Sequence, residues 1–188
     1  LVMIGLAFSL MFGDGASAYL SLKLGEKKKK EAETGIGNGI LLSAIASIFF
    51  CIITLIFLPQ FLTIFGCTEK LREFAMIYGK IIAIGLPFSM IGTTLNSIIR
   101  ADGNPKFAMI SMVAGAILNT ILDPIFIFKL DMGVAGAAIA TVISQVLTFV
   151  LNVAYIKKFK SIQLSKESFK LKAGVCKKVS MLGISSFI

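Results

Sequence analysis

The sequence predicts an all-α protein, a polytopic bundle of membrane helices, and three observations support this fold class. The chain of 188 residues is 56% hydrophobic, and its mean hydropathy of +0.90 is too high for an ordinary soluble domain. Its apolar residues fall into runs of about 20 residues or more, the length that crosses a bilayer as a helix. Its basic residues gather between those runs. We expect five complete spans, at residues 1–22, 35–58, 74–99, 107–128 and 133–155.

Most of the basic residues lie in three connections, at residues 23–30, 100–106 and 157–178. These connections follow the first, third and fifth spans, so all three lie on one side of the membrane. The positive-inside rule assigns that side to the cytoplasm, and we expect a multi-pass protein of the plasma (cytoplasmic) membrane. The net charge of +9 does not indicate nucleic-acid binding, because no aromatic interleaving or basic fold motif accompanies the lysines.

An acidic residue, Asp14, lies within the first span between Gly13 and Gly15. Small neighbours let another helix or a substrate approach closely. A carboxylate inside a membrane is costly and is therefore a candidate functional group. Two interpretations remain open: an additional intramembrane acid with a role in function, or a buried, hydrogen-bonded Asp that holds helices together.

The next two spans contain structural signals. The second span ends at Pro59, and the mixture of apolar and charged residues at 60–73 predicts a short interfacial helix. The third span contains Lys80, whose side chain can extend to the headgroups, and a kink is expected at Pro87. The Gly- and Pro-containing turn at 100–106 returns the chain on the basic side.

The fourth span contains the strongest candidate site. From residue 107 to 128 the only ionisable side chain is Asp123, and Asn119 lies one helical turn before it on the same face. Pro124 has no N–H, so we expect a kink there and a Thr120 carbonyl without its usual helical partner. An amide oxygen, a carboxylate and a free carbonyl suit a small hard cation or a proton.

The fifth span follows after a very short connection, so it is expected to be the antiparallel neighbour of the fourth. Its small residues recur at i, i+4 spacing, which is typical of close helix packing. Thr141 is then expected to reach the face of Asn119 and Asp123, although a Thr in a membrane helix commonly bonds to its own backbone.

The basic connection at 157–178 contains spaced apolar residues and is predicted to lie on the anionic inner leaflet as an amphipathic segment. A last apolar run begins at about residue 179. Because both ends of the chain fall in apolar runs, we expect it to be an internal piece of a longer protein.

Several motifs together resemble one transporter family. They are Leu24–Gly25 before the first basic connection, GLPF at 85–88, RADGNPK at 100–106, Asn119-x-x-x-Asp123-Pro124 and GVAGAA at 133–138. In this order and spacing the chain is similar, over essentially its whole length, to MATE (multidrug and toxic compound extrusion) transporters of the bacterial MepA-like branch.

The resemblance implies a fold of twelve helices in two lobes of six. The five spans would be the second to sixth helices, so residues 1–156 would form most of the N-terminal lobe. Residues 157–178 would be the cytoplasmic linker between the lobes, and residues 179–188 would start the first helix of the C-terminal lobe. The resemblance also implies a cation site formed by Asn119, Asp123 and Thr141.

The implied function is export of hydrophobic or cationic drugs by alternating access, coupled to Na+ or H+, with no cofactor other than the coupling ion. The expected partners are small-molecule drugs and membrane lipids, with the full-length protein acting as a monomer. One alternative is a lipid-precursor or polysaccharide flippase of the same superfamily, which generally lacks the Asn–Asp–Thr set. Another is a non-transporting scaffold. An enzyme is not expected, because the sequence has no His, Cys-centred dyad or paired acidic loop motif.

Overall fold

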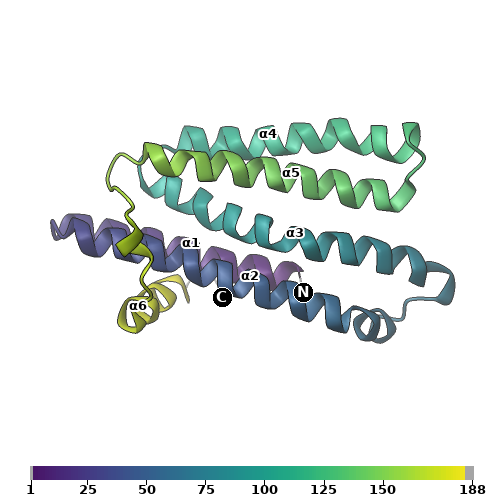
Figure 1. Ribbon diagram of the computed structural model, residues 1–188, viewed down its shortest axis with the longest axis horizontal. Helices are drawn as coiled ribbons and strands as arrows, with labels where there is room; N and C mark the ends of the chain where they lie inside the picture. Colours follow the sequence, from purple (N-terminus) through teal and green to yellow (C-terminus); the bar gives the residue numbers. More distant parts are fainter. Residues whose placement is uncertain (1, 185–188) are drawn as a thin grey trace.

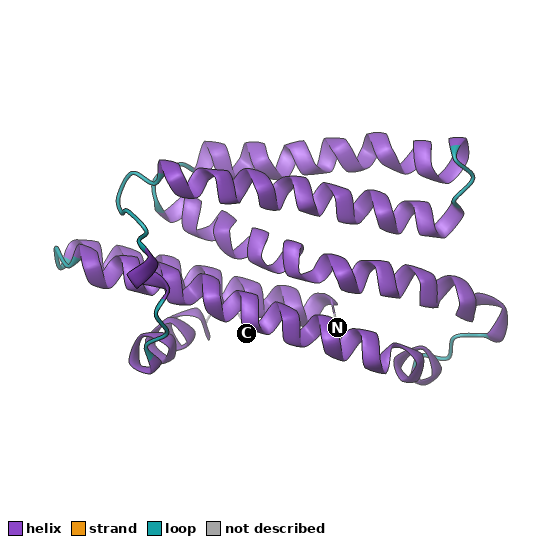
Figure 2. Ribbon diagram, viewed as in Figure 1, coloured by secondary structure: helices purple, strands orange, loops and turns teal. Residues whose placement is uncertain are grey.

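The computed structural model describes residues 2–184, apart from the side chains of Lys70 and Lys166, and these residues form helices and turns without a strand. Five long helices run roughly alongside one another, and a short sixth helix packs beside the N-terminal pair (Figure 1). Short loops join most of them (Figure 2). The helices are α1 (Val2–Gly25), α2 (Lys29–Ile64), α3 (Glu69–Ala101), α4 (Pro105–Pro124), α5 (Gly133–Tyr155) and α6 (Ala173–Gly183).

The predicted spans coincide with the five long helices, the first from residue 2 onwards. All five are long and apolar enough to cross a membrane. Most helices extend beyond the predicted bounds, because polar residues at their ends continue the hydrogen-bonded turns. α3 runs without interruption through Pro87, the position where the sequence predicts a kink.

The predicted interfacial helix at 60–73 is wrong. α2 continues through Pro59 to Ile64, and only residues 65–68 connect it to α3. The apolar residues at 61–64 extend the apolar pattern of α2, and Gly66 turns the chain at φ 71°. The charged residues belong to α3, whose first residue, Glu69, is favourable at a helix N-terminus.

The larger apolar core lies where α1, α2 and α3 meet near the basic end of the bundle. Leu20, Ile36 and Ile98 are fully buried there. α3 packs against α1, α2 and α5, whereas α4 packs mainly on α5. Within the bundle, Thr94 Oγ1 donates to the Ser9 carbonyl at 3.0 Å and lies 2.9 Å from Ser43 Oγ. These bonds satisfy polar groups that cannot reach water.

The outer faces of the long helices are apolar. On α2 the large exposed side chains recur at helical spacing, at Ile45, Ile48, Phe49, Ile52 and Ile56. In a soluble protein such a stripe would be buried against another element. A face of this length and composition is the surface expected of a membrane helix in contact with lipid.

The linker, the segment of residues 156–172 after α5, is bound to the helices by two buried polar side chains, Asp102 and Asn38. It contains two 3₁₀ turns, Ile156–Lys158 and Lys166–Phe169. Asp102 accepts hydrogen bonds of 2.9 Å from the N–H groups of Lys160 and Ser161. Asn38 donates to the Lys170 carbonyl at 3.1 Å and accepts from the Lys172 N–H at 2.9 Å. The linker is therefore a folded part of the helical bundle.

This packing differs from the predicted amphipathic segment. Ile162 is buried in the core, and Leu164 and Val175 pack against it, so these apolar side chains face the protein. Phe169 and Leu171 are exposed. The apolar spacing arises because the segment covers the base of α1 and α2.

The last helix begins earlier than predicted, at Ala173 instead of residue 179. α6 crosses α1 where glycines meet its backbone: a Cβ added at Gly15 would meet the Val179 carbonyl, and one at Gly183 the Met11 carbonyl. Residues 185–188 of the predicted tail lie outside the described residues.

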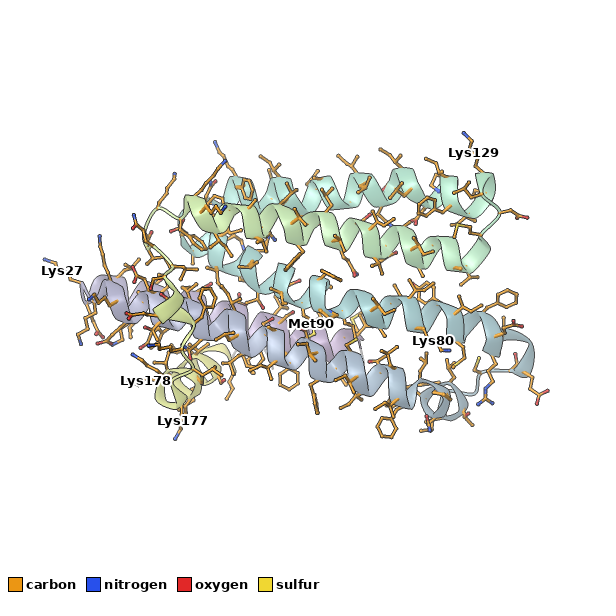
Figure 3. The ribbon with its side chains drawn as sticks, in the orientation of Figure 1. Lys27, Lys80, Met90, Lys129, Lys177 and Lys178 are labelled. Atoms are coloured by element: carbon orange, nitrogen blue, oxygen red, sulfur yellow. The ribbon has the colours of Figure 1, made fainter. Side chains whose placement is uncertain are left out.

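The labelled lysines divide between the two ends of the bundle. Figure 3 shows Lys27, Lys177 and Lys178 near one end and Lys129 at the other. The turn between α3 and α4, which directly follows the last turn of α3 with Arg100, lies at the first of these ends in Figure 1. The basic connections therefore share one side of the bundle, as their order in the sequence predicts.

Candidate functional site

A cavity of about 490 Å³ opens between α3, α4 and α5. Its apolar wall includes Leu10, Phe88 and Met112. Its remaining wall is rich in hydroxyl and amide side chains, which come from three helices: Ser89, Thr93 and Asn96 from α3, Asn119 from α4, and Thr141, Ser144, Gln145 and Thr148 from α5. An apolar pocket with a few convergent polar groups is the typical form of a small-molecule site.

Asn119 and Asp123 form a bonded pair on α4. Asn119 Nδ2 donates to Asp123 Oδ1 at 3.2 Å, as expected for residues one turn apart, and both residues are partly buried. Asn119 lines the cavity, whereas Asp123 is not one of the lining residues and is connected to the cavity through its bond to Asn119. The amide fixes one carboxylate oxygen and leaves the other available for a proton or a cation.

Thr141 lines the same cavity from α5. Its hydroxyl donates to the Ala137 carbonyl at 2.9 Å, the backbone bond that is common for Thr in membrane helices. That bond uses the hydroxyl proton, so the oxygen lone pairs remain available to a ligand. The three predicted site residues are thus brought together in part: Asn119 bonds Asp123, and Asn119 and Thr141 share the cavity.

The chain changes its hydrogen-bonding pattern directly after Pro124. α4 ends there and a π-helical turn, Ile125–Lys129, follows. The N–H of Ile125 bonds the Leu122 carbonyl, and that of Leu130 bonds the Ile125 carbonyl at 2.9 Å. π-turns are frequent at functional sites. The predicted kink at Pro124 thus takes the form of a junction between α and π geometry.

A glycine lets α5 approach this turn. A Cβ added at Gly136 would lie 2.8 Å from the carbonyl oxygen of Phe126, so only glycine permits the observed distance between the turn and α5. The close contact positions α4 and α5 on either side of the cavity.

Arg100 adds a positive charge to the cavity at the basic end of α3. Its guanidinium Nη2 donates to Ser97 Oγ at 3.0 Å, and the residue is otherwise exposed. Asn119 and Thr141 lie far along their helices from the basic end, so the cavity has a cationic group near that end and these two polar side chains farther from it.

Comparison with known proteins identifies the family. A family model described as MatE matches residues 1–125, more than half of the chain. The chain belongs to the MatE family. The multidrug export protein MepA of Staphylococcus aureus (strain MSSA476) is 33% identical to this MatE chain over 187 residues, which cover 95% of the chain and 40% of that protein.

Solved structures agree with this assignment. An inward-facing multidrug resistance MATE family transporter of the MOP superfamily matches 99% of this MatE chain and 43% of its own, with 28% identity and a TM-score of 0.92. An outward-facing structure of such a transporter matches 99% of this chain and 42% of its own, with 28% identity and a TM-score of 0.90. The chain spans about two fifths of the length of these relatives.

These comparisons confirm the predicted family resemblance and the predicted all-α membrane fold. The chain is a multi-pass membrane protein whose matched relatives are transporters and not enzymes. The bacterial source of the relative MepA implies a location in the plasma membrane.

Gln145 is a further cavity residue of this MatE chain that was not predicted from the sequence. Its Oε1 is buried without a hydrogen-bond partner among the described residues, and the side chain lines the cavity. The sequence contained a usable signal, since Gln145 is an amide within the apolar run 133–155. The rule that directed attention to Asn119, that polar groups within spans have specific partners, applies equally to Gln145.

Asp14 lies apart from the cavity. It is partly buried on α1, and its carboxylate makes no hydrogen bond or ion pair within residues 2–184. Its neighbour Gly15 provides the close contact with α6. The structure therefore does not join Asp14 to Asn119, Asp123 and Thr141.

Proposed function

We propose that this chain forms most of the N-terminal lobe of a cation-coupled multidrug efflux antiporter, which exports hydrophobic or cationic compounds by alternating access. The observation that supports this most directly is the shared cavity: Asn119 and Thr141 line it, and Asn119 bonds the carboxylate of Asp123. A chain this apolar has little reason to keep a carboxylate in a membrane helix unless the group binds something.

The coupling ion, Na+ or H+, is the second substrate of the exchange. Asn119, Asp123 and Thr141 would supply an amide oxygen, a carboxylate and a hydroxyl, which are hard ligands suited to Na+. A proton would instead neutralise Asp123 directly. Either ion removes the cost of a bare charge at this depth, and so favours the packing in which Asp123 is shielded.

Drug and ion must favour different states of the transporter for exchange to be coupled. The Phe88 and Met112 side chains give the cavity an apolar, adaptable wall that tolerates different shapes. Its hydroxyl and amide groups offer hydrogen bonds to a polar or cationic end of a drug. The described fold matches relatives in inward-facing and outward-facing conformations with TM-scores of 0.92 and 0.90, which supports a lobe that moves largely as one body.

The direction of transport follows from the side on which the basic connections lie. The positive-inside rule places that side in the cytoplasm. A drug entering the cavity from the cytoplasmic side would then leave on the other side, in exchange for an entering cation. The full-length protein would do this as a monomer, because one cavity and one ion site suffice.

The test uses the full-length protein in proteoliposomes with an imposed Na+ or pH gradient and a fluorescent cationic dye. Asp123→Asn should abolish gradient-driven efflux while leaving membrane insertion and thermal stability close to those of the unchanged protein. The matched control is Asp131→Asn, the same substitution at an exposed turn residue, which should transport normally.

Other outcomes distinguish the alternatives. Normal efflux by the Asp123→Asn variant together with a lower melting temperature would support a scaffold role for Asp123. Substrate movement that needs neither the Na+ nor the pH gradient, in the unchanged protein and in the Asp123→Asn variant alike, would support a flippase and contradict the antiporter.

A further inference from the structure

A second cavity, of about 820 Å³, lies between the linker and the base of α1 and α2. It shares no lining residue with the cavity described above. Four lysines line it: Lys30 from α2, Lys170 and Lys172 from the linker, and Lys178 from α6. Figure 3 shows Lys178 near the same end of the molecule as Lys27.

The charge in this basic pocket is not balanced by ion pairs. None of the four lysines forms a salt bridge among the described residues. Of the carboxylates that line the pocket, Glu31 is paired with Lys23 at 3.0 Å. Glu33 accepts a hydrogen bond from the Gln163 N–H at 3.3 Å. With Glu31 paired to Lys23, only Glu33 and Glu167 remain among the lining carboxylates to balance the four lysines. The pocket therefore has an excess of positive charge.

Uncapped backbone donors face the same space. Gly174 and Val175, in the first turn of α6, line the pocket. The turn contains no acidic side chain, and Lys172 at its start makes no side-chain cap. The N–H groups of Ala173 and Gly174 donate no hydrogen bond within the described part of the chain. Free N–H groups at a helix N-terminus attract an anion.

A buried tyrosine independently indicates a ligand. Tyr19 is 3% exposed, yet it lines the pocket and its hydroxyl makes no hydrogen bond among the described residues. Its ring packs on Gly35 and lies 5.7 Å from Lys23 Nζ. A tyrosine buried to this extent usually has a partner for its hydroxyl. Because Tyr19 lines the pocket, a ligand bound there could supply this partner.

The linker segment at the pocket has one polar and one apolar side. Its backbone is extended at Lys170 and Lys172, so alternate side chains point in opposite directions. Lys170 and Lys172 line the pocket, whereas Phe169 and Leu171 are exposed. This alternation suits a headgroup on one side and lipid chains on the other, and it disfavours a freely soluble anion.

We propose that this pocket binds the phosphate headgroup of an anionic phospholipid. The lysine ammonium groups neutralise the phosphate, the first turn of α6 and the Tyr19 hydroxyl donate hydrogen bonds to its oxygens, and Phe169 and Leu171 contact the acyl chains. A lipid held this way bridges α2, the linker and α6.

The experiment measures phosphatidylglycerol bound to the full-length protein by native mass spectrometry after extraction from mixed phosphatidylglycerol and phosphatidylcholine vesicles. A Lys170→Gln, Lys172→Gln double variant should retain phosphatidylglycerol about tenfold less well. Tyr19→Phe should lower retention by a smaller factor. The control is Lys157→Gln, Lys158→Gln, which removes the same charge from exposed positions outside the pocket and should retain the lipid.

Three outcomes would overturn the proposal. Equal losses in the two double variants would mean that general surface charge attracts the lipid. Unchanged retention of phosphatidylglycerol by the Lys170→Gln, Lys172→Gln variant would mean that the pocket binds no lipid. An unchanged melting temperature of that variant in phosphatidylcholine shows that it is folded for this comparison. Displacement of the lipid by millimolar inorganic phosphate would indicate a site for a soluble anion.

Discussion

The carboxylate of Asp102 accepts a 2.9 Å hydrogen bond from the backbone N–H of Ser161, a residue 59 positions later in the chain. Asp102 also accepts from the Lys160 N–H at 2.9 Å and from the Tyr155 hydroxyl at 3.3 Å. It is 3% exposed, so water does not compete for these bonds. One side chain in the turn between α3 and α4 therefore fixes where the linker begins.

Replacing Asp102 by Asn should loosen the linker. The amide places an N–H₂ group opposite backbone N–H groups, so at least one bond is lost and the full-length protein should be destabilised by about 2–3 kcal/mol. Thermal unfolding and protease cleavage within residues 156–172 measure the effect. Asp131→Asn, at an exposed turn, is the control, and equal cleavage of the two variants would contradict the role of Asp102.

Removing the Thr141 hydroxyl should weaken ion coupling. Thr141→Val keeps the shape of the side chain but lacks the oxygen, so the Na+ or H+ concentration for half-maximal efflux should rise about tenfold, equivalent to ~1.4 kcal/mol. Thr141→Ser retains the oxygen and should behave normally. Thr120→Val is the matched control, because Thr120 is exposed on α4 and bonds its own backbone. An unchanged ion dependence in Thr141→Val would exclude the hydroxyl as a ligand.

Replacing Gln145, whose Oε1 is buried without a partner among residues 2–184, should lower drug affinity without lowering protein stability. Gln145→Met removes a buried acceptor that has no partner, so the melting temperature should stay the same or rise. Affinity for a cationic dye should fall about fivefold, because the variant loses a hydrogen bond worth ~1 kcal/mol to the ligand. Equilibrium dye binding measures this, and unchanged affinity would mean that Gln145 does not contact the drug.

The crossing of α1 and α6 should be sensitive to a single methyl group. Gly15→Ala directs a Cβ at the Val179 carbonyl, which backbone movement must relieve at a cost of about 1–3 kcal/mol. Gly25→Ala, on the same helix, meets nothing within 4 Å and should leave the melting temperature unchanged. If both variants melt alike, the two helices are less closely packed than described.

Acid should weaken the basic end of the bundle. Hydrogen bonds from Lys23 and then Lys28 hold the pKa of Glu26 below its ordinary value of 4.5. A carboxylate with a lowered pKa stabilises the folded protein fully above the unfolded value, and that contribution is lost as pH falls through the folded value. Melting temperature should therefore drop more below pH ~4.5 in the unchanged protein than in Glu26→Gln. An equal drop in melting temperature with falling pH in the two proteins would contradict this role of Glu26.

The sequence predicted the spans and the pairing of Asn119 with Asp123 because both depend on local periodicity. Helical spacing alone places residues 119 and 123 one turn apart, and the 3.2 Å bond follows. The prediction of an interfacial helix at 60–73 was wrong, because composition cannot distinguish the end of α2 from a separate helix. Only the continuation of hydrogen bonding through Pro59 decides it.

The bonds that hold the linker could not be predicted from spacing. Asn38 bonds Lys170 and Lys172, which lie more than 130 residues away along the chain. Such contacts arise from tertiary packing of distant segments. Gln145 was missed for a different reason. The sequence shows an amide within an apolar run, but the missing partner of its Oε1 among the described residues is a feature of the tertiary packing.

The linker is bound through main-chain atoms, which every amino acid provides. Asp102 bonds two of its N–H groups, and Asn38 bonds one N–H and one carbonyl. Exposed side chains between these points, such as Gln163, can therefore mutate without changing the path of the chain, as long as proline does not replace a donor. The path of this segment across α2 and the turn after α3 therefore depends on where its backbone donors and acceptor lie more than on the identity of its exposed side chains.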